Sequence, residues 1–197
     1  MTIPWRVLVV ASLSLLLYPS PASPGNVPDS DVARPQDLET IQFKIVLLEK
    51  FTRFVEWPRD SDVKDTSKPF VIGVIEDEAF RKNLDDAYAN QLIKNKKVVV
   101  RLIVHQSEIA GCNLIFIPNI LKWEFSSIIE AIKKKPIFTI SEVNDVPPKG
   151  IHIGLFMRRE KIRYWVNETA LKESNFECDW HLLKGAEELL EPLRRRR

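Results

Sequence analysis

The first apolar pattern after residue 40 has the period of a helix. Over residues 41–55, apolar side chains recur at helical spacing along one wide arc, and charged side chains fill the opposite arc. An arc this wide is typical of a helix packed on a sheet rather than of a coiled coil. The pair Trp57-Pro58 then ends the helix, because proline lacks an amide hydrogen and restricts the residue before it to extended geometry.

Apolar runs and helical spacings alternate along the rest of the chain. Continuous apolar runs predict buried strands over residues 69–75, 98–104, 113–117 and 137–140. Helices are expected between them, one capped by Asp77 with Phe80, Leu84, Tyr88 and Leu92 on its apolar face, and one over 125–135. This alternation predicts an α/β sandwich, in which helices flank a mostly parallel, mixed sheet and the opening helix packs across one face.

A C-terminal β-hairpin is the exception to this alternation. Residues 151–157 and 162–166 flank a charged turn at 158–161, and one face of the hairpin is apolar throughout. The other face carries Phe156 and Trp165 among charged residues. It is either a partner-binding surface or a face covered by the C-terminal helix. Together with Trp180, these two aromatic residues are the candidates for partner binding.

The two ends of the chain differ from the middle. Residues 1–22 contain one Arg, an apolar run and the small-x-small sequence Ser20-Pro21-Ala22, which indicates a secretory signal peptide; an uncleaved membrane anchor is the alternative. Residues 23–36, rich in proline and polar residues, are expected to be a flexible tether. A domain over 37–193 follows, long enough for one core, and then a basic tail, 194–197.

Charge argues against a nucleic-acid partner. Residues 23–197 hold 28 Lys and Arg against 27 Asp and Glu, and without the four terminal arginines the count is 24 against 27. Such a body lacks the basic patch of a nucleic-acid binder. The arginine tail is either a solubilising end or a weak contact with an anionic membrane surface.

Residues that could carry chemistry are sparse. The three histidines are far apart and show no metal-ligand spacing, the glycines form no phosphate loop, and no nucleophile elbow is present, so neither metal nor cofactor is expected. Glu76, Asp77, Ser141 and Glu142 follow predicted strands, where a ligand pocket or an acid–base pair would lie. The simpler interpretation of the first two is a helix cap with a solvated neighbour.

Four segments together resemble the YfiR family of exported bacterial regulators over residues 41–190. They are KIVLLEKFTRFVEWP (44–58), PFVIGVIEDEAF (69–80), GCNLIFI (111–117) and PIFTISE (136–142). The resemblance implies an α/β fold, a homodimer and no catalysis. It also implies a periplasmic role in restraining the sensor region of a membrane-bound diguanylate cyclase, which lowers cyclic-di-GMP. A periplasmic small-molecule sensor without catalytic activity is the alternative, and a hydrolase using the strand-end carboxylates is a third hypothesis.

The chain departs from this family late in the sequence. It has GIHIGLF (150–156) where the family tends toward a Gly-Gly-Met-Ile-Asn-Phe-like strand, and FECDWHLLKGA (176–186) where the family tends toward a serine-containing segment. Cys112 matches a family cysteine, whereas Cys178 lies in the departing region. In an exported protein these two residues could form one disulfide, which we predict, or remain two buried thiols.

Overall fold

A computed structural model describes residues 35–119, 124–133, 135–142 and 149–190. The expected signal peptide (1–22), the tether as far as residue 34 and the basic tail (194–197) lie outside these residues. Within the described ranges, no helix combines the length and apolar character that crossing a bilayer requires.

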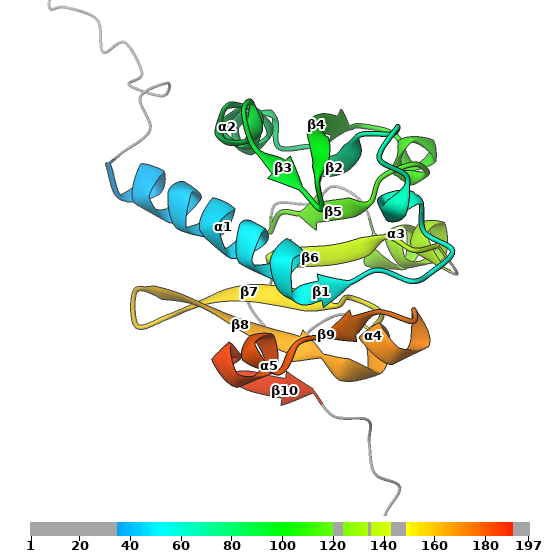
Figure 1. Ribbon diagram of the computed structural model, residues 1–197. Coiled ribbons are helices and arrows are strands. Elements are labelled where there is room, and N and C mark those ends of the chain that lie inside the picture. The colour runs from blue at the N-terminus through cyan, green and yellow to red at the C-terminus, as the bar shows by residue number, and fades with distance from the viewer. Residues whose placement is uncertain (1–34, 120–123, 134, 143–148, 191–197) are drawn as a thin grey trace, which may run out of the picture. The chain divides into compact units, whose positions relative to one another are not determined.

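The described residues form a mixed β-sheet of eight strands in the order β10-β8-β7-β6-β5-β2-β4-β3 (Figure 1). The strands are β2 (Phe70–Ile75), β3 (Leu92–Ile93), β4 (Lys96–Ile103), β5 (Leu114–Ile117), β6 (Phe138–Glu142), β7 (Ile153–Arg158), β8 (Lys161–Asn167) and β10 (Glu188–Leu190). All neighbours run parallel except β7–β8 and β3–β4. The predicted α/β class, the mostly parallel sheet and the C-terminal hairpin are confirmed.

Helices cover both faces of this sheet. The helical elements are α1 (Pro35–Phe54), α2 (Glu78–Tyr88), α3 (Phe125–Ile132), α4 (Glu168–Glu173) and α5 (Trp180–Gly185), with 3₁₀ turns at η1 (Asp62–Lys64) and η2 (Gln106–Ile109). Alternate residues of β2 belong to two apolar cores, one shared with α1 and α2 and the other with η2 and α3. The long helix α1 crosses one face of the sheet, as its wide apolar arc predicted (Figure 1).

The segment after α1 fixes the end of that helix. Trp57 is buried, and its Nε1 donates a hydrogen bond to the carbonyl of Asn113, at 3.2 Å. Its ring meets Phe70, Phe138 and Phe176 at centroid distances of 5.4–5.8 Å. Residues 55–56 then form β1 (Val55–Glu56), which pairs with β9 (Glu177–Cys178) in a separate two-stranded sheet that the sequence pattern did not predict.

Helix α2 is shorter than expected. Asp77 caps it by accepting a hydrogen bond from the amide of Phe80, at 2.9 Å, as predicted. The helix ends at Tyr88, so the placement of Leu92 on its apolar face is wrong. Leu92 begins β3, because Lys94 and Asn95 adopt positive φ values of 51° and 63° and turn the chain directly into β4.

Candidate functional site

A groove lies between the amino-terminal half of α1 and the tip of the β7–β8 hairpin. It encloses about 770 Å³ and is lined by Glu39, Thr40, Phe43, Met157, Glu160, Lys161, Ile162 and Arg163. A hollow of about 130 Å³ continues it toward the end of β6 and is lined by Thr40, Lys44, Asn119, Glu142, Leu155, Phe156, Met157 and Ile162. These two hollows are called the α1–hairpin groove below.

The helix wall of the groove carries one large apolar side chain, Phe43, which is open to solvent among the polar residues Glu39, Thr40 and Lys44. Phe43 keeps 46% of its surface exposed, although the next turn of the same helix, at Leu47, is buried in the core. A helix that is apolar beyond its buried stripe has a second face suited to a partner.

The tip of the β7–β8 hairpin forms the other wall of the groove. The apolar face that packs in the core at the base of the hairpin continues there past the core. Arg159 and Glu160 adopt φ values of 49° and 60°, which suit the two-residue type I′ turn that keeps both strands paired to the tip. Met157 and Ile162 are paired across the two strands on the α1 side, and Met157 is 58% exposed. The apolar floor of the groove therefore reaches solvent.

An ion pair closes the inner end of the groove. Lys44 of α1 contacts Glu142 at the end of β6, and the two side chains are 20% and 19% exposed. The ammonium of Lys44 also lies 5.8 Å from the ring centroid of Phe80. These contacts tie the amino-terminal half of α1 to β6 of the sheet and to α2.

The outer rim of the groove is charged. Its charged lining residues are Glu39, Glu160, Lys161 and Arg163. Glu187, just before β10, pairs with Arg163 at 3.3 Å between Oε2 and Nε, and also with Arg158. An apolar floor with a charged rim is the usual anatomy of a protein–protein interface.

Two of the predicted partner-binding residues lie at separate places on the surface. Phe156 is half-buried and lines the smaller hollow of the groove. Trp180 is 56% exposed on α5, beside His181, whose ring stacks on Phe54 at the carboxyl end of α1. Phe54 lies 11 positions after Phe43, which corresponds to about 16 Å along the helix. Trp180 therefore lies outside the α1–hairpin groove, and partner binding through Phe156 and Trp180 stays a prediction.

Trp165 is buried rather than exposed, and the expectation of a surface aromatic at this position is wrong. It is 3% exposed and belongs to the core on the α3 side of the sheet. Its indole occupies the space over Gly154, where an added Cβ would lie 1.8 Å from Cζ2. Trp165 is covered by the apolar core that contains α3, and not by the C-terminal helix that the sequence suggested.

The strand-end residues Glu76, Asp77, Ser141 and Glu142 serve different local purposes. Asp77 caps α2, and Glu76 sits at a turn with φ 52°. Ser141 is fully buried, with its hydroxyl 3.3 Å from the carbonyl of Glu142. Of the four, Glu142 alone lines the α1–hairpin groove, where Lys44 already engages it. They do not converge on one pocket.

The predicted disulfide between Cys112 and Cys178 is absent, because both residues are free thiols. Cys112 is buried in the core on the α3 side, and Cys178 packs against the core on the α1 side, so the sheet separates them. Burial raises the pKa of Cys112 to about 11 and that of Cys178 to about 12, which keeps both protonated at neutral pH. Over the described part of the chain, no group of three His, Cys, Asp or Glu side chains forms a metal site.

Sequence reasoning missed the residues that open the groove. Phe43 was counted within the apolar arc of the helix, and Met157 within the core face of the hairpin. The excess width of that arc, which leaves Phe43 exposed beside the buried stripe, was the available signal.

Comparison with known proteins adds one family match. A family model described as YfiR/HmsC-like matches residues 41–187. No curated protein matches the chain. Among solved structures, an ABC domain from Streptococcus pneumonia, in complex with L-Trp, matches with a TM-score of 0.46 at 12% identity, over 72% of this chain and 59% of that one. A likeness this low supports no statement about shared fold or function.

Proposed function

The chain belongs to the YfiR/HmsC-like family, and from that membership we propose that it is a periplasmic repressor of a membrane-bound diguanylate cyclase. The family is regulatory rather than catalytic and is associated with cyclic-di-GMP signalling. In this proposal residues 1–22 direct export, and the protein acts as a homodimer. The arginine tail, 194–197, adds a weak contact with the membrane surface.

The observation that carries the proposal is the α1–hairpin groove. Phe43 and Met157 are two large apolar side chains about half exposed on facing walls. Their burial by a partner would remove apolar surface from water, which favours association. Docking of the cyclase's periplasmic sensor region in this groove holds the enzyme in its inactive state, and release restores cyclic-di-GMP synthesis.

The alternative of a small-molecule sensor has less support from the geometry. Its four candidate residues are spread over a helix cap, a turn, the buried interior of β6 and an ion pair. The hollow beside Glu142, at about 130 Å³, is well below the roughly 300 Å³ at which ligand pockets begin, and none of the four residues lines the larger hollow of about 770 Å³.

Binding between the purified protein and the cyclase's sensor region, measured by calorimetry, tests the proposal. We expect Phe43→Asp and Met157→Asp each to weaken binding at least about thirtyfold, as for an interface anchor worth about 2 kcal/mol. In cells, the same two variants should raise cyclic-di-GMP to the level of a strain lacking the protein.

Val46→Asp is the matched control. Val46 lies on the same helix and is 58% exposed, but it does not line the groove. If Val46→Asp weakens binding as strongly as Phe43→Asp, the groove assignment is wrong. If wild-type protein binds no sensor region and its deletion leaves cyclic-di-GMP unchanged, the repressor function itself is wrong.

A further inference from the structure

The β4 edge of the sheet is open over most of its length. On one side β4 pairs with β2 from Val98 to Ile103. On the other side β3 pairs only with Lys96 and Lys97, so in the described part of the chain no strand lies beside residues 98–103. The unpaired stretch of the edge ends at Val104 and His105, whose amides each donate a hydrogen bond to the carboxylate of Glu108 at 2.8 Å.

The direction of the backbone groups on this edge follows from one hydrogen bond. The amide of Glu76 donates to the carbonyl of Ile103 at 3.1 Å, so the polar groups of residue 103 point toward β2. Because these groups alternate along a strand, those of Val98, Val100 and Leu102 point outward. An extended polypeptide is the ligand that satisfies such a row of alternating donors and acceptors.

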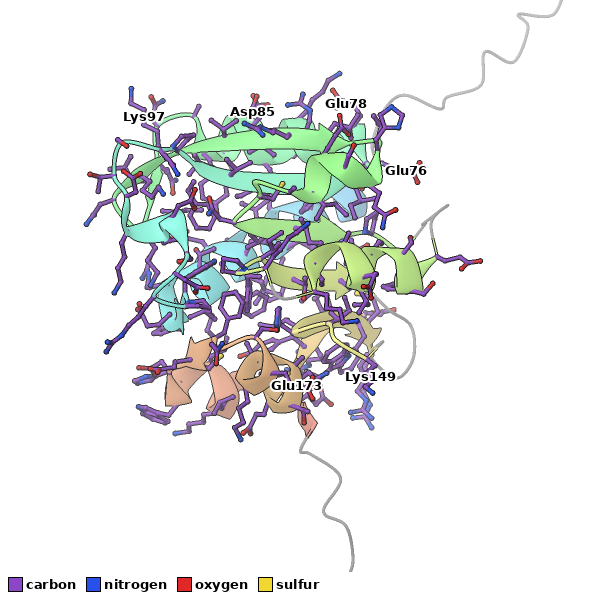
Figure 2. The ribbon with its side chains drawn as sticks, turned by 90° about the vertical axis from the view of Figure 1, so that its right-hand side faces the viewer. Glu76, Glu78, Asp85, Lys97, Lys149 and Glu173 are labelled. Carbon is purple, nitrogen blue, oxygen red and sulfur yellow. The ribbon has the colours of Figure 1, made fainter. Side chains whose placement is uncertain are left out.

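The sheet face beside this edge is partly uncovered on the α3 side. Leu92 is 61% exposed and Val99 is 37% exposed, and the register places both on this face with Lys97 and Arg101. Lys97 and Arg101 are exposed, and neither takes part in an ion pair with another described residue. Figure 2 shows Lys97 projecting outward from its corner of the molecule. The edge thus offers two cations four residues apart, with an apolar residue between them.

We propose that the β4 edge binds an extended segment of a partner protein in which acidic and apolar side chains alternate. The segment pairs its backbone with Val98–Ile103 and places an apolar residue opposite Val99. Acidic residues two positions to either side of that residue reach Arg101 and Lys97. This surface is separate from the α1–hairpin groove and does not depend on the proposed function.

Charge favours this occupant over a second copy of the chain. Two β4 edges in contact would bring the Lys97 and Arg101 side chains of both copies together, and like charges on adjacent strands are destabilising. A strand with acidic side chains would instead form favourable charge pairs with Lys97 and Arg101.

The test uses the purified protein and the seven-residue peptide acetyl-TETVTET-amide, followed by ¹⁵N NMR titration. We expect amide shifts centred on Val98–Ile103. The double variant K97E/R101E should bind the peptide about tenfold more weakly, because it exchanges two surface ion pairs for two repulsions. The same variant should instead bind acetyl-TKTVTKT-amide, which also shows that it remains folded.

Two controls separate strand pairing from general charge attraction. Lys149→Glu makes the same kind of charge change far from Lys97 (Figure 2) and should alter affinity less than twofold. A TETVTET peptide N-methylated on alternate amides keeps its charges but cannot pair, and it should not bind. The proposal is overturned by equal binding of the methylated peptide, by shifts away from β4, or by no effect of K97E/R101E. It is also overturned if wild type sediments as a dimer in which the amides of Val98, Val100 and Leu102 are already protected from exchange.

Discussion

The base and the tip of the β7–β8 hairpin have the same alternating pattern but opposite environments. At the base, Ile153, Leu155 and Val166 are at most 3% exposed on the α1 side, and Trp165 is equally buried on the other. At the tip, Met157 continues the same apolar face and is 58% exposed. The alternation therefore fixes which side chains share a face, whereas the reach of the covering helices decides which of them are buried.

Substitutions at the base and at the tip should therefore affect different properties, namely stability and partner binding. At the base, side chains fill a closed core, so substitutions there should act on folding. At the tip, the side chains are already solvated, so substitutions should act on a partner.

The largest expected effect is at the base. Trp165→Ala removes a buried indole and should lower the free energy of unfolding by about 3–5 kcal/mol, measured by urea denaturation. Gly154→Ala should cost about 1–3 kcal/mol, because its Cβ would lie 1.8 Å from the indole. In the Trp165→Ala background that cost should largely vanish. A Gly154→Ala cost that stays the same in both backgrounds would contradict the packing described here.

The next effect concerns acid stability at the base. His152 is buried between Phe138 and Phe176, and its Nδ1 accepts a hydrogen bond from the amide of Thr139 at 3.0 Å. Burial lowers its pKa to about 3, from 6.5. Since the unfolded chain binds this proton more readily, the stabilisation is complete above about pH 6.5 and falls as the pH drops toward 3.

His152→Gln tests this pH dependence. Between pH 7 and pH 4.5, wild type should lose about 2 kcal/mol more unfolding free energy than the variant, which cannot take up the proton. Urea denaturation at both pH values measures the difference. Parallel losses in the two proteins would show that other groups govern acid unfolding.

Much of the fold was predictable from local pattern. The runs that became β2, β5 and β6 are continuous and apolar because helices cover both faces, and Asp77 marked the start of α2 by its position alone. The pairs β1–β9 and β10–β8 were not predictable, since each depends on contacts between segments far apart in the sequence rather than on a pattern within either strand.

The candidate site was less predictable for the same reason. Trp165 among charged neighbours suggests a surface, until Gly154 on the adjacent strand is seen to provide room for the ring. Likewise, Cys112 and Cys178 looked pairable because sequence does not show on which face of the sheet each residue lies.

A smaller effect distinguishes a helix cap from a ligand-binding carboxylate. Asp77→Ala removes the acceptor for the amide of Phe80 and should cost about 1 kcal/mol. Asp77→Asn keeps an acceptor oxygen and should cost only a few tenths of that. Thermal unfolding measures both, and equal losses would contradict the capping role.

The smallest effect on stability belongs to the tip and completes the contrast with Trp165. Met157→Ala should change the free energy of unfolding by less than about 0.5 kcal/mol, because an exposed side chain has little burial to lose. The same substitution should still weaken sensor-region binding, since any burial of Met157 occurs only in the complex. Urea denaturation and calorimetry on one preparation compare the two effects directly. A stability loss approaching that of Trp165→Ala would mean that the tip is part of the core, and the groove would then lose one of its two exposed apolar side chains.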